Sequence, residues 1–267
     1  MSGGKKGLYI FLIVFLSILV LGLGALLVVG LTGKGGFFGF RFGQSHTSSN
    51  LVIDKKYDFE ELEDVKIKIK AGSLKVLNTE SEDDEVALKF YAEKEKWADV
   101  NATRSSLKIE DKSDDCHFIC FNWEGVKIEL YLPAKYAGKL VIESDYGDME
   151  VGSFNEASVY LDSSAGDVRV ESAKNITASL SAGNFELGDC LGKLKIDNSM
   201  GNVEIDHLHL SEDSDIDMSM GNVEIDHVGD VRVESDVSLG DSSIEGDNKK
   251  SDIVLKIDNS MGNVTVR

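Results

Sequence analysis

The sequence predicts an all-β protein, a β-solenoid built from coils of about 19 residues. The main observation is a segment that occurs three times with few changes, as KIDNSMGNVEIDH at 195–207, DIDMSMGNVEIDH at 215–227 and KIDNSMGNVTV at 256–266. Each copy has the pattern of a strand, a tight turn with glycine and a second strand. Units this short cannot bury their apolar faces alone, so we expect them to stack on their neighbours.

Looser copies share the pattern Gly-(Asp/Asn/Ser)-apolar-x-apolar, and the first begins at Gly72. From Gly147 onward the glycines follow at steps of 19, 17, 18, 20, 19 and 22 residues, which gives the solenoid its period. Glycine adopts positive φ at little cost, so we expect it at the turn of each coil. The predicted turn glycines are Gly147, Gly166, Gly183, Gly201, Gly221, Gly240 and Gly262.

Alternation around each glycine predicts which side chains point inward. The residues two and four after the glycine and five before it are mostly apolar, as in Val203, Ile205 and Ile196 around Gly201. The Gly240 coil has Ser235 and Ser242 at such positions, so we expect it to be the softest. Three residues before the glycine, we expect an inward polar ladder from coil to coil, made by Ser144, Ser163, Asn198 and Asn259.

The segment 51–139 precedes the regular repeats at 140–267. It contains short alternating runs such as 65–69, 86–90 and 126–132, and it has no long helical pattern. We expect several antiparallel strands that cap the first coil, because an open solenoid end leaves backbone groups unpaired.

An uncharged apolar run of 24 residues, Leu8–Leu31, is long enough to cross a bilayer as a helix. We interpret it as an uncleaved single-pass signal-anchor; the alternative is a cleaved signal peptide, whose apolar region is usually shorter. Lys5 and Lys6 place residues 1–7 in the cytoplasm and the rest outside the cell membrane. Residues 32–50 then form a Gly/Phe/Ser-rich linker, whose four phenylalanines either sit in the membrane interface or belong to a disordered tether.

The chain carries a formal net charge of −19, and all 47 acidic residues follow residue 50, against 24 basic ones there. This charge excludes a general nucleic-acid binder, which needs a basic surface. It also disfavours electrostatic adsorption to anionic lipid.

Several motifs together carry a family resemblance. A single N-terminal span is followed by an antiparallel β segment, a strand VKIELYLP that ends at Pro133, the segment LVIESDYGDMEV at 140–151 and further GDVRV units. In this order the chain resembles the bacterial putative-adhesin β-strand-repeat family over residues 50–267. That family is a domain of unknown function, and it includes membrane-anchored Lia-operon-type proteins associated with cell-envelope stress in Gram-positive bacteria. The resemblance implies an extracellular β-solenoid and supplies no catalytic residue.

Outward positions hold the candidate metal ligands. Glu186, Glu204 and Glu224 recur at one position of successive coils, and Asp197 and Asp217 recur at another. Stacked carboxylates repel one another, and Ca²⁺ could relieve that repulsion; a solvated acidic face is the simpler interpretation. His207 and His227 also stack and could bind Zn²⁺ or another transition metal, or only decorate a turn.

The three cysteines are Cys116, Cys120 and Cys190, an odd number that argues against a disulfide framework. We interpret them as buried unpaired thiols, since C-x3-C with one histidine is a weak zinc pattern. The sequence shows no catalytic triad, P-loop or dinucleotide fingerprint, so we predict no enzyme and no cofactor.

Three functions remain open. The first is a non-enzymatic interaction or scaffold protein of the cell envelope, which has an unidentified membrane or wall partner and could act in the envelope-stress response. The second is a surface adhesin for glycan or another host or wall ligand, and the third is a divalent-cation-binding structural module. Because the chain ends inside a repeat, at Arg267, we also expect weak homo-association through the C-terminal coil.

Overall fold

The structure is a computed structural model, and it describes residues 46–59, 61–79, 85–114 and 124–267. Leu8–Leu31, the expected membrane span, lies outside the described residues, as does most of the linker. Among the described residues, no helix is long and apolar enough to cross a membrane. Residues 45–267 form one compact unit.

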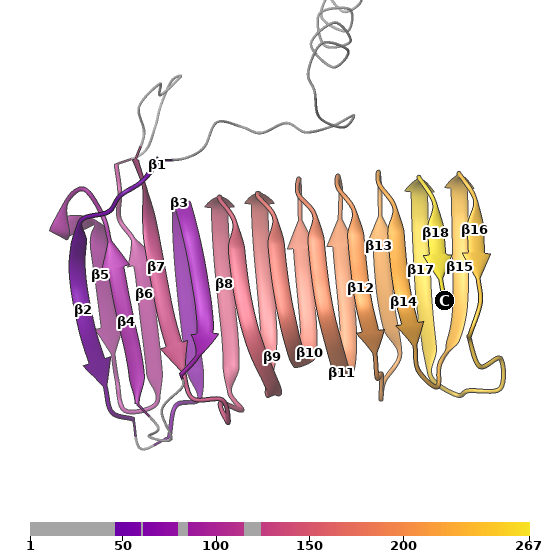
Figure 1. The fold of residues 1–267 in the computed structure, drawn as a ribbon, viewed down its shortest axis with the longest axis horizontal. Helices are drawn as coiled ribbons and strands as arrows, with labels where there is room; N and C mark the ends of the chain where they lie inside the picture. The colour runs from indigo at the N-terminus through magenta and orange to yellow at the C-terminus, as the bar shows by residue number, and fades with distance from the viewer. Residues whose placement is uncertain (1–45, 60, 80–84, 115–123) are drawn as a thin grey trace, which may run out of the picture. The chain divides into compact units, whose positions relative to one another are not determined.

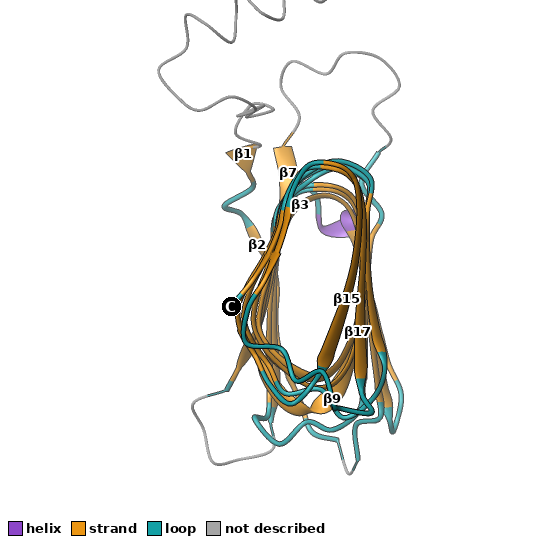
Figure 2. Cartoon of the chain, turned by 90° about the vertical axis from the view of Figure 1, so that its right-hand side faces the viewer, coloured by secondary structure: helices purple, strands orange, loops and turns teal. Residues whose placement is uncertain are grey.

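This unit is an all-β solenoid of stacked coils (Figure 1). Seen along its axis, each coil is a flattened oval with two long walls (Figure 2). The first wall contains the strand before each turn glycine, and the second wall contains the strand after it. Four long strands bend around the oval and contribute to both walls: β3 (Asp64–Asn78), β9 (Met149–Ala165), β10 (Val168–Leu180) and β11 (Phe185–Asn198).

The other strands of the stack belong to one wall each. Those of the first wall are β6 (Ser106–Asp111), β8 (Lys139–Tyr146), β13 (Ser214–Met218), β15 (Arg232–Leu239) and β17 (Val254–Met261). Those of the second wall are β7 (Glu124–Leu132), β12 (Val203–Leu208), β14 (Val223–Val228), β16 (Ser242–Ile244) and β18 (Val264–Val266). From β6 and β7 onward, all pairings within each wall are parallel and keep equivalent residues in register.

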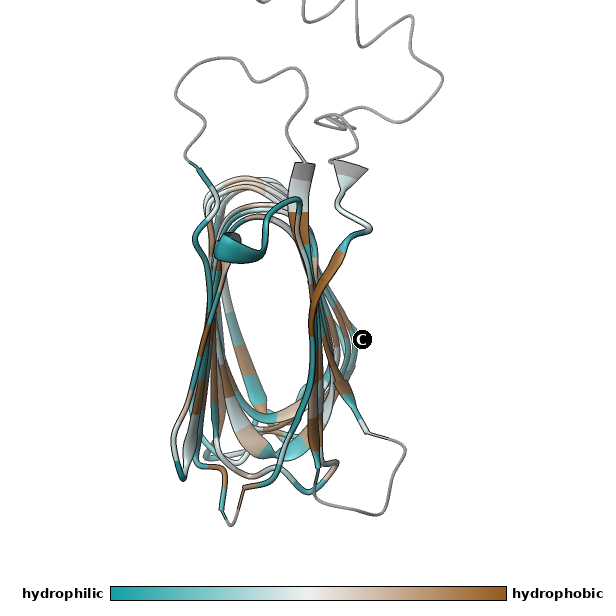
Figure 3. Ribbon diagram, turned by 90° about the vertical axis from the view of Figure 1, so that its left-hand side faces the viewer, coloured by the Kyte–Doolittle hydropathy of each residue, from teal (hydrophilic) through white to brown (hydrophobic). Residues whose placement is uncertain are grey.

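Antiparallel strands close one end of the stack. On the second wall, β4 (Val86–Tyr91) pairs with β7 and β2 (Leu51–Tyr57) pairs with β4; on the first wall, β5 (Ala98–Ala102) pairs with β6. A 3₁₀ turn, η1 (Glu95–Trp97), lies at this end (Figure 3). Its Trp97 is buried. A two-residue strand, β1 (His46–Thr47), runs parallel to β7.

The turn glycines form a column along one edge of the oval. All seven predicted turn glycines, and Gly72, have positive φ, between +130° and +148°. A Cβ on any of these eight would come within 1.7–2.2 Å of a backbone carbonyl oxygen of the neighbouring coil. Glycine is therefore needed for two reasons, backbone conformation and close approach of coils. We name each coil by its turn glycine.

The stacking order differs from the chain order at the C-terminal end. The Gly262 coil (β17 and β18) lies between the Gly221 coil (β13 and β14) and the Gly240 coil (β15 and β16). The chain thus passes over one position to form the last coil and returns to fill the gap. The expectation that the C-terminal coil is the exposed end was wrong, because β18 has a partner on each side.

The N-terminal end shows the same exchange. β3, the first coil of the chain, lies between the coil formed by β6 and β7 and the Gly147 coil formed by β8 and β9. Segment 51–139 therefore does more than cap the repeats at 140–267: it also supplies two stacked coils with parallel pairing. In the described part of this segment, the strands that pair antiparallel outside them are β2, β4 and β5.

The inward positions form one continuous apolar core. The predicted inward side chains are buried in the coils from Gly147 to Gly221 and in the Gly262 coil. Apolar and polar residues alternate along the strands (Figure 3). Only the Gly240 coil departs, with Ser242 exposed and Ser235 and Ile244 half-buried. Its weak core is explained by its place, because the last coil has a neighbour on one side only.

The expected inward polar ladder is not continuous. Asn198 and Asn259 are buried but separated by Met218 of the intervening coil. Each donates instead to the carbonyl of a neighbouring turn glycine, at 3.1 and 3.0 Å. A continuous ladder, which we call the turn ladder, runs through the residues directly after the turn glycines. The side-chain oxygen of one residue accepts the backbone N–H of its equivalent in the next coil, at 2.9–3.1 Å. In stacking order its members are Asp148, Asp167, Asn184, Asn202, Asn222, Asn263 and Asp241.

Candidate interaction surface

The outer face of the second wall carries a column of charged residues in register. From Lys89 the column alternates in sign, through Glu129, Lys75, Glu150, Arg169 and Glu186. Opposite charges on neighbouring strands stabilise a sheet, whereas like charges destabilise it. Lys75 forms an ion pair with Glu150, and Arg169 forms one with Glu186 at 3.1 Å.

The alternation stops at the three predicted glutamates. Glu186, Glu204 and Glu224 lie directly beside one another on β11, β12 and β14. Arg267 lies next to this group and binds both Glu224 and Asp226, at 2.6 and 2.7 Å. Glu204 lies between the two paired glutamates, and in the described part of the chain it has no ion-pair partner. The column thus lacks one cation, at Glu204.

A shallow depression lies beside Glu204. It is lined by Glu171, Gly188 and Asp206 as well as by Arg169, Glu186 and Glu204. Gly188 opens it, because glycine leaves no side chain between Glu171 and Asp206 of the adjacent coils. A Cβ at Gly188 would approach the carbonyl oxygen of Glu171 at 2.4 Å, so the depression is a consequence of close coil packing.

The predicted aspartates lie on the other wall. Asp197 and Asp217 are in register with Asp258 and Asp236, which makes a column of four aspartates on the first wall. Lys256 neighbours this column and forms an ion pair with Asp258. The hydrogen bond to Asp258 raises the pKa of Lys256. The aspartates and the glutamates therefore belong to two separate surfaces.

These columns do not assemble a metal centre in the structure. Over residues 46–59, 61–79, 85–114 and 124–267, no three His, Cys, Asp or Glu side chains are placed to hold one ion. Coils about 4.8 Å apart set the carboxylates side by side along a line. Ca²⁺ takes six to eight oxygens around it, and a straight row presents oxygens from one side only.

The histidines lie on the second wall as a stack. The rings of His207 and His227 are 4.7 Å apart and nearly parallel, and the ring of His209 lies 6.4 Å from that of His207. Nδ1 of His209 is 2.9 Å from Asp189. Ring nitrogens bind a metal along their own ring plane, at about 2.0–2.1 Å, so two face-to-face rings do not converge on one ion. His207 and His227 are therefore a stack of exposed side chains on neighbouring strands.

Cys190 is a buried free thiol that faces the carbonyl oxygens of Lys174 and Lys193. Burial raises its pKa to about 11, so the reactive thiolate is disfavoured. Cys116 and Cys120 lie outside the described residues.

Sequence reasoning missed three members of these surfaces: Asp258, Asp236 and Arg267. Asp236 and Asp258 lie four residues before their turn glycines, as Asp197 and Asp217 do, so the register alone aligns them. Arg267 reaches Glu224 only because the last two coils exchange places. Asp258 would otherwise have been placed one coil further from Asp217. A signal was present in the weak core of the Gly240 coil, which marks it as the end of the stack.

Comparison with known proteins identifies a family that covers most of this chain. The family described as Toastrack DUF4097 matches residues 65–267. No curated protein matches the chain. Solved structures of similar fold include one named putative adhesin from Parabacteroides distasonis, with 12% identity, a TM-score of 0.45 and coverage of 80% of this chain and 96% of that one.

Two further structures are similar at this level. One is named putative lipid binding protein, also from Parabacteroides distasonis, with 13% identity, a TM-score of 0.41 and coverage of 83% and 98%. The other is named putative cell adhesion protein, from Clostridium sporogenes, with 13% identity, a TM-score of 0.35 and coverage of 80% and 99%. The family match covers the solenoid from β3 to the last strand, and the resemblance inferred from the sequence is confirmed: the chain belongs to the Toastrack DUF4097 family.

Proposed function

We propose that this protein is a non-enzymatic interaction or scaffold protein of the bacterial cell envelope. In this proposal Leu8–Leu31 anchors the chain in the cell membrane, and the solenoid stands outside it. The second wall of the solenoid is the surface that meets a protein of the membrane or wall. The family is a domain of unknown function, and it is compatible with a surface or interaction role.

The observation that carries the proposal is the interrupted charge column of the second wall. Each cross-strand neighbour up to Glu186 has the opposite sign, and Arg267 restores the pattern at Glu224. Glu204 alone lies between like charges on both sides. A lysine or arginine of a partner would complete the column there. We therefore expect the partner to present a basic segment.

The wall suits such a contact because it is rigid and regular. Its strands are joined by continuous parallel pairing from β7 to β16, and the turn ladder ties successive coils together. An extended basic segment could therefore meet several coils without ordering a loop, which would cost conformational entropy.

The test is crosslinking in intact cells that carry the full chain, with a photoreactive residue in place of Glu204, followed by mass spectrometry. The matched control places the same residue at Thr177, which is exposed on the first wall. We expect a discrete membrane or wall protein captured from position 204 and not from position 177. Polysaccharide adducts only, or equal capture from both positions, would contradict the proposal.

A cation-binding structural module is the second candidate, because a cation beside the four-aspartate column of the first wall would relieve the repulsion between its carboxylates, although the row alone does not surround an ion. A ligand that binds only the folded state raises the melting temperature. This function requires a large Ca²⁺-dependent rise in melting temperature that Asp217→Asn removes. An equal response in the wild type and in Asp217→Asn would contradict it.

A glycan adhesin has less support from the exposed aromatic side chains. Phe154 and Phe185 are fully buried, and the ring of Tyr160 is covered by the Lys139 ammonium at 4.6 Å from its centre. Within the described repeats, Tyr146 is the aromatic ring left open for stacking on a sugar.

A further inference from the structure

The exposed apolar side chains of the solenoid gather on one edge. Seven large hydrophobic residues are exposed in the described part of the chain, and five of them occupy the same position, directly before a turn glycine. They are Tyr146, Met200, Met220, Met261 and Leu239. Alanine fills this position in the Gly166 and Gly183 coils, so no coil from Gly147 to Gly240 has a charge there.

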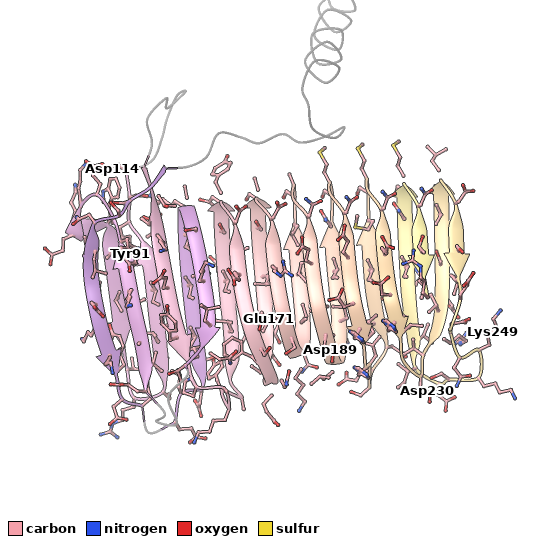
Figure 4. All side chains as sticks on the ribbon, in the orientation of Figure 1. Tyr91, Asp114, Glu171, Asp189, Asp230 and Lys249 are labelled. Carbon is pink, nitrogen blue, oxygen red and sulfur yellow. The ribbon has the colours of Figure 1, made fainter. Side chains whose placement is uncertain are left out.

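Backbone hydrogen bonds hold this column straight. From the Gly166 coil to the Gly240 coil, the residue at this position accepts, at its carbonyl, the N–H of the turn glycine in a neighbouring coil, at 2.8–3.1 Å. In stacking order the last members are Met200, Met220, Met261 and Leu239, which we call the methionine edge. The sulfur atoms project in a row from this edge of the solenoid (Figure 4). The exchange of the last two coils is what makes the three methionines consecutive.

The turns that carry the three methionines are uncharged, and a charge returns at Asp241 beside Leu239. Each of the three methionines lies in a Ser-Met-Gly-Asn turn, at 199–202, 219–222 and 260–263. The serines and asparagines carry no charge, and the asparagines are fixed by the turn ladder. In a chain with a net charge of −19, such a stretch is a clear departure. The edge is also convex and linear, a shape that fits a plane better than a pocket.

We propose that the methionine edge rests in the interfacial region of the lipid bilayer that anchors the chain. Met and Leu side chains gain by leaving water for that region, and the uncharged turns lose little solvation there. The lipid surface is contacted by apolar side chains, so the acidic walls need no attraction to anionic headgroups. This inference rests on the proposed function, because it uses the membrane anchor.

The position of the chain entry supports a lipid occupant. Thr47 pairs with Gly125, and a Cβ on Gly125 would lie 2.8 Å from the Cα of Gly72, so the chain enters at the turn edge. Fourteen residues separate Leu31 from His46, and they span at most about 50 Å. The methionine edge begins five coils further along, about 24 Å away at 4.8 Å per coil. An anchor at Leu8–Leu31 therefore leaves the methionine edge within reach of the same membrane.

The consequence is an orientation for the solenoid. With its turn edge on the lipid, the solenoid axis lies along the membrane and both walls stand away from it. The second wall, with Glu204, is then open to a partner from the side.

The experiment uses the full chain in phosphatidylcholine vesicles that contain lipids with brominated acyl chains, which quench tryptophan within the bilayer. Met220→Trp places a reporter on the methionine edge; Tyr146 at the equivalent position shows that an aromatic side chain is accommodated. Glu204→Trp is the matched control on the second wall. The two native tryptophans give the background.

We expect the additional tryptophan of Met220→Trp to be quenched at least about twofold more than that of Glu204→Trp. Equal quenching of the two variants in protein that floats with the vesicles would overturn the inference and leave the anchor intact. Flotation of the vesicles separates the two proposals: protein that does not float with them would contradict the anchor itself, and with it this inference.

Discussion

At the scale of single residues, the turn glycines control how closely the coils approach. A Cβ at Gly201 would lie 1.9 Å from the carbonyl oxygen of Gly183, a distance that no side chain tolerates. The φ of +137° at Gly201 adds a second obstacle for any other residue. The contact is backbone to backbone, so no side-chain rotation can relieve it.

Gly201→Ala should therefore lower the free energy of unfolding by about 3 kcal/mol or more, through strain and separation of two coils. Urea unfolding of residues 46–267 would measure it. Met200→Ala is the matched control, because Met200 is exposed beside the same turn and should change stability by less than about 0.5 kcal/mol. Equal effects of the two substitutions would show that the coils are not this tightly packed.

Glu110 illustrates how a surface charge is held on the first wall. Its carboxylate lies between the ammonium groups of Lys108, at 2.6 Å, and Lys112. Hydrogen bonds from Lys108 and then Lys112 lower the pKa of Glu110 to about 2. A lowered pKa stabilises the folded state above the pKa of the unfolded chain, and this stabilisation is lost as the pH falls toward 2.

Glu110→Gln should thus lower stability at pH 7 by about 1 kcal/mol, with the difference from the wild type vanishing between about pH 4.5 and pH 2. Thermal unfolding as a function of pH would measure the difference. Glu156→Gln serves as the control, since Glu156 is exposed and has no ion pair within the described residues. A pH-independent loss in Glu110→Gln would show that packing, and not the charge, is responsible.

At the scale of elements, the decisive feature is the exchange of the last two coils. Among the described strands, β15 pairs only with β17 and β16 only with β18, so the Gly240 coil depends on residues that follow it in the chain. β13 and β14 have partners on both sides, in β11 and β12 and in β17 and β18. We therefore expect the local stability of a strand to depend on how many neighbouring strands it pairs with, and not on its distance from the C-terminus.

Truncation after Asn248 removes β17 and β18 and tests this order. We expect the amides of β15 and β16 to exchange rapidly with deuterium in the truncated protein, while those of β14 keep their protection through β12. The full chain is the reference. Persistent protection of β15 would mean that it can pair with β13 and that the coils follow the chain order.

The aspartate column gives a second prediction at this scale. Asp217 lies between Asp197 and Asp258, so removal of its charge relieves repulsion on both sides. Asp217→Asn should raise the free energy of unfolding by about 0.5 kcal/mol at low salt and by less at high salt. Asp162→Asn is the control, because its neighbours are Ser179 and an ion-paired Glu143. If the Asp217→Asn variant is no more stable than the wild type, salt and the nearby lysines already screen the aspartate column.

At the scale of the whole molecule, the two ends of the stack differ. Antiparallel strands and Trp97 cover one end, whereas β15 and β16 leave a strand edge at the other. Lys249 lies on the loop beyond that edge, and Asp230 holds the loop through Asn248 at 2.5 Å (Figure 4). Charged residues at an edge limit pairing with other chains but do not close it.

Homo-association remains a proposal, now assigned to the edge of β15 and β16. We expect sedimentation of residues 46–267 to show weak association at high concentration. Val237→Lys, which puts a charge at a half-buried position of this end, should abolish it. Thr177→Lys makes the same charge change on an exposed wall and should leave it intact. A strict monomer at all concentrations would remove the proposal.

The amino-acid sequence by itself determined the repeating unit. Glycine spacing and alternation identified the turns, the inward residues and the family, because these depend on contacts that every coil repeats, such as those of Val203 and Ile205 beside Gly201. The same alternation placed Glu204 and Asp217 outward, although not on opposite walls.

Only the tertiary structure decided the order in which coils stack. Every coil offers nearly the same two edges, so local pattern cannot choose between the Gly240 and Gly262 coils as the neighbour of Gly221. The choice depends on the whole stack. The Gly240 coil has few apolar core residues and lies at the end, where it has one neighbouring coil, whereas the Gly262 coil has an apolar core and packs against a coil on each side. That choice aligns the three methionines, sets Asp258 beside Asp217 and brings Arg267 to Glu224.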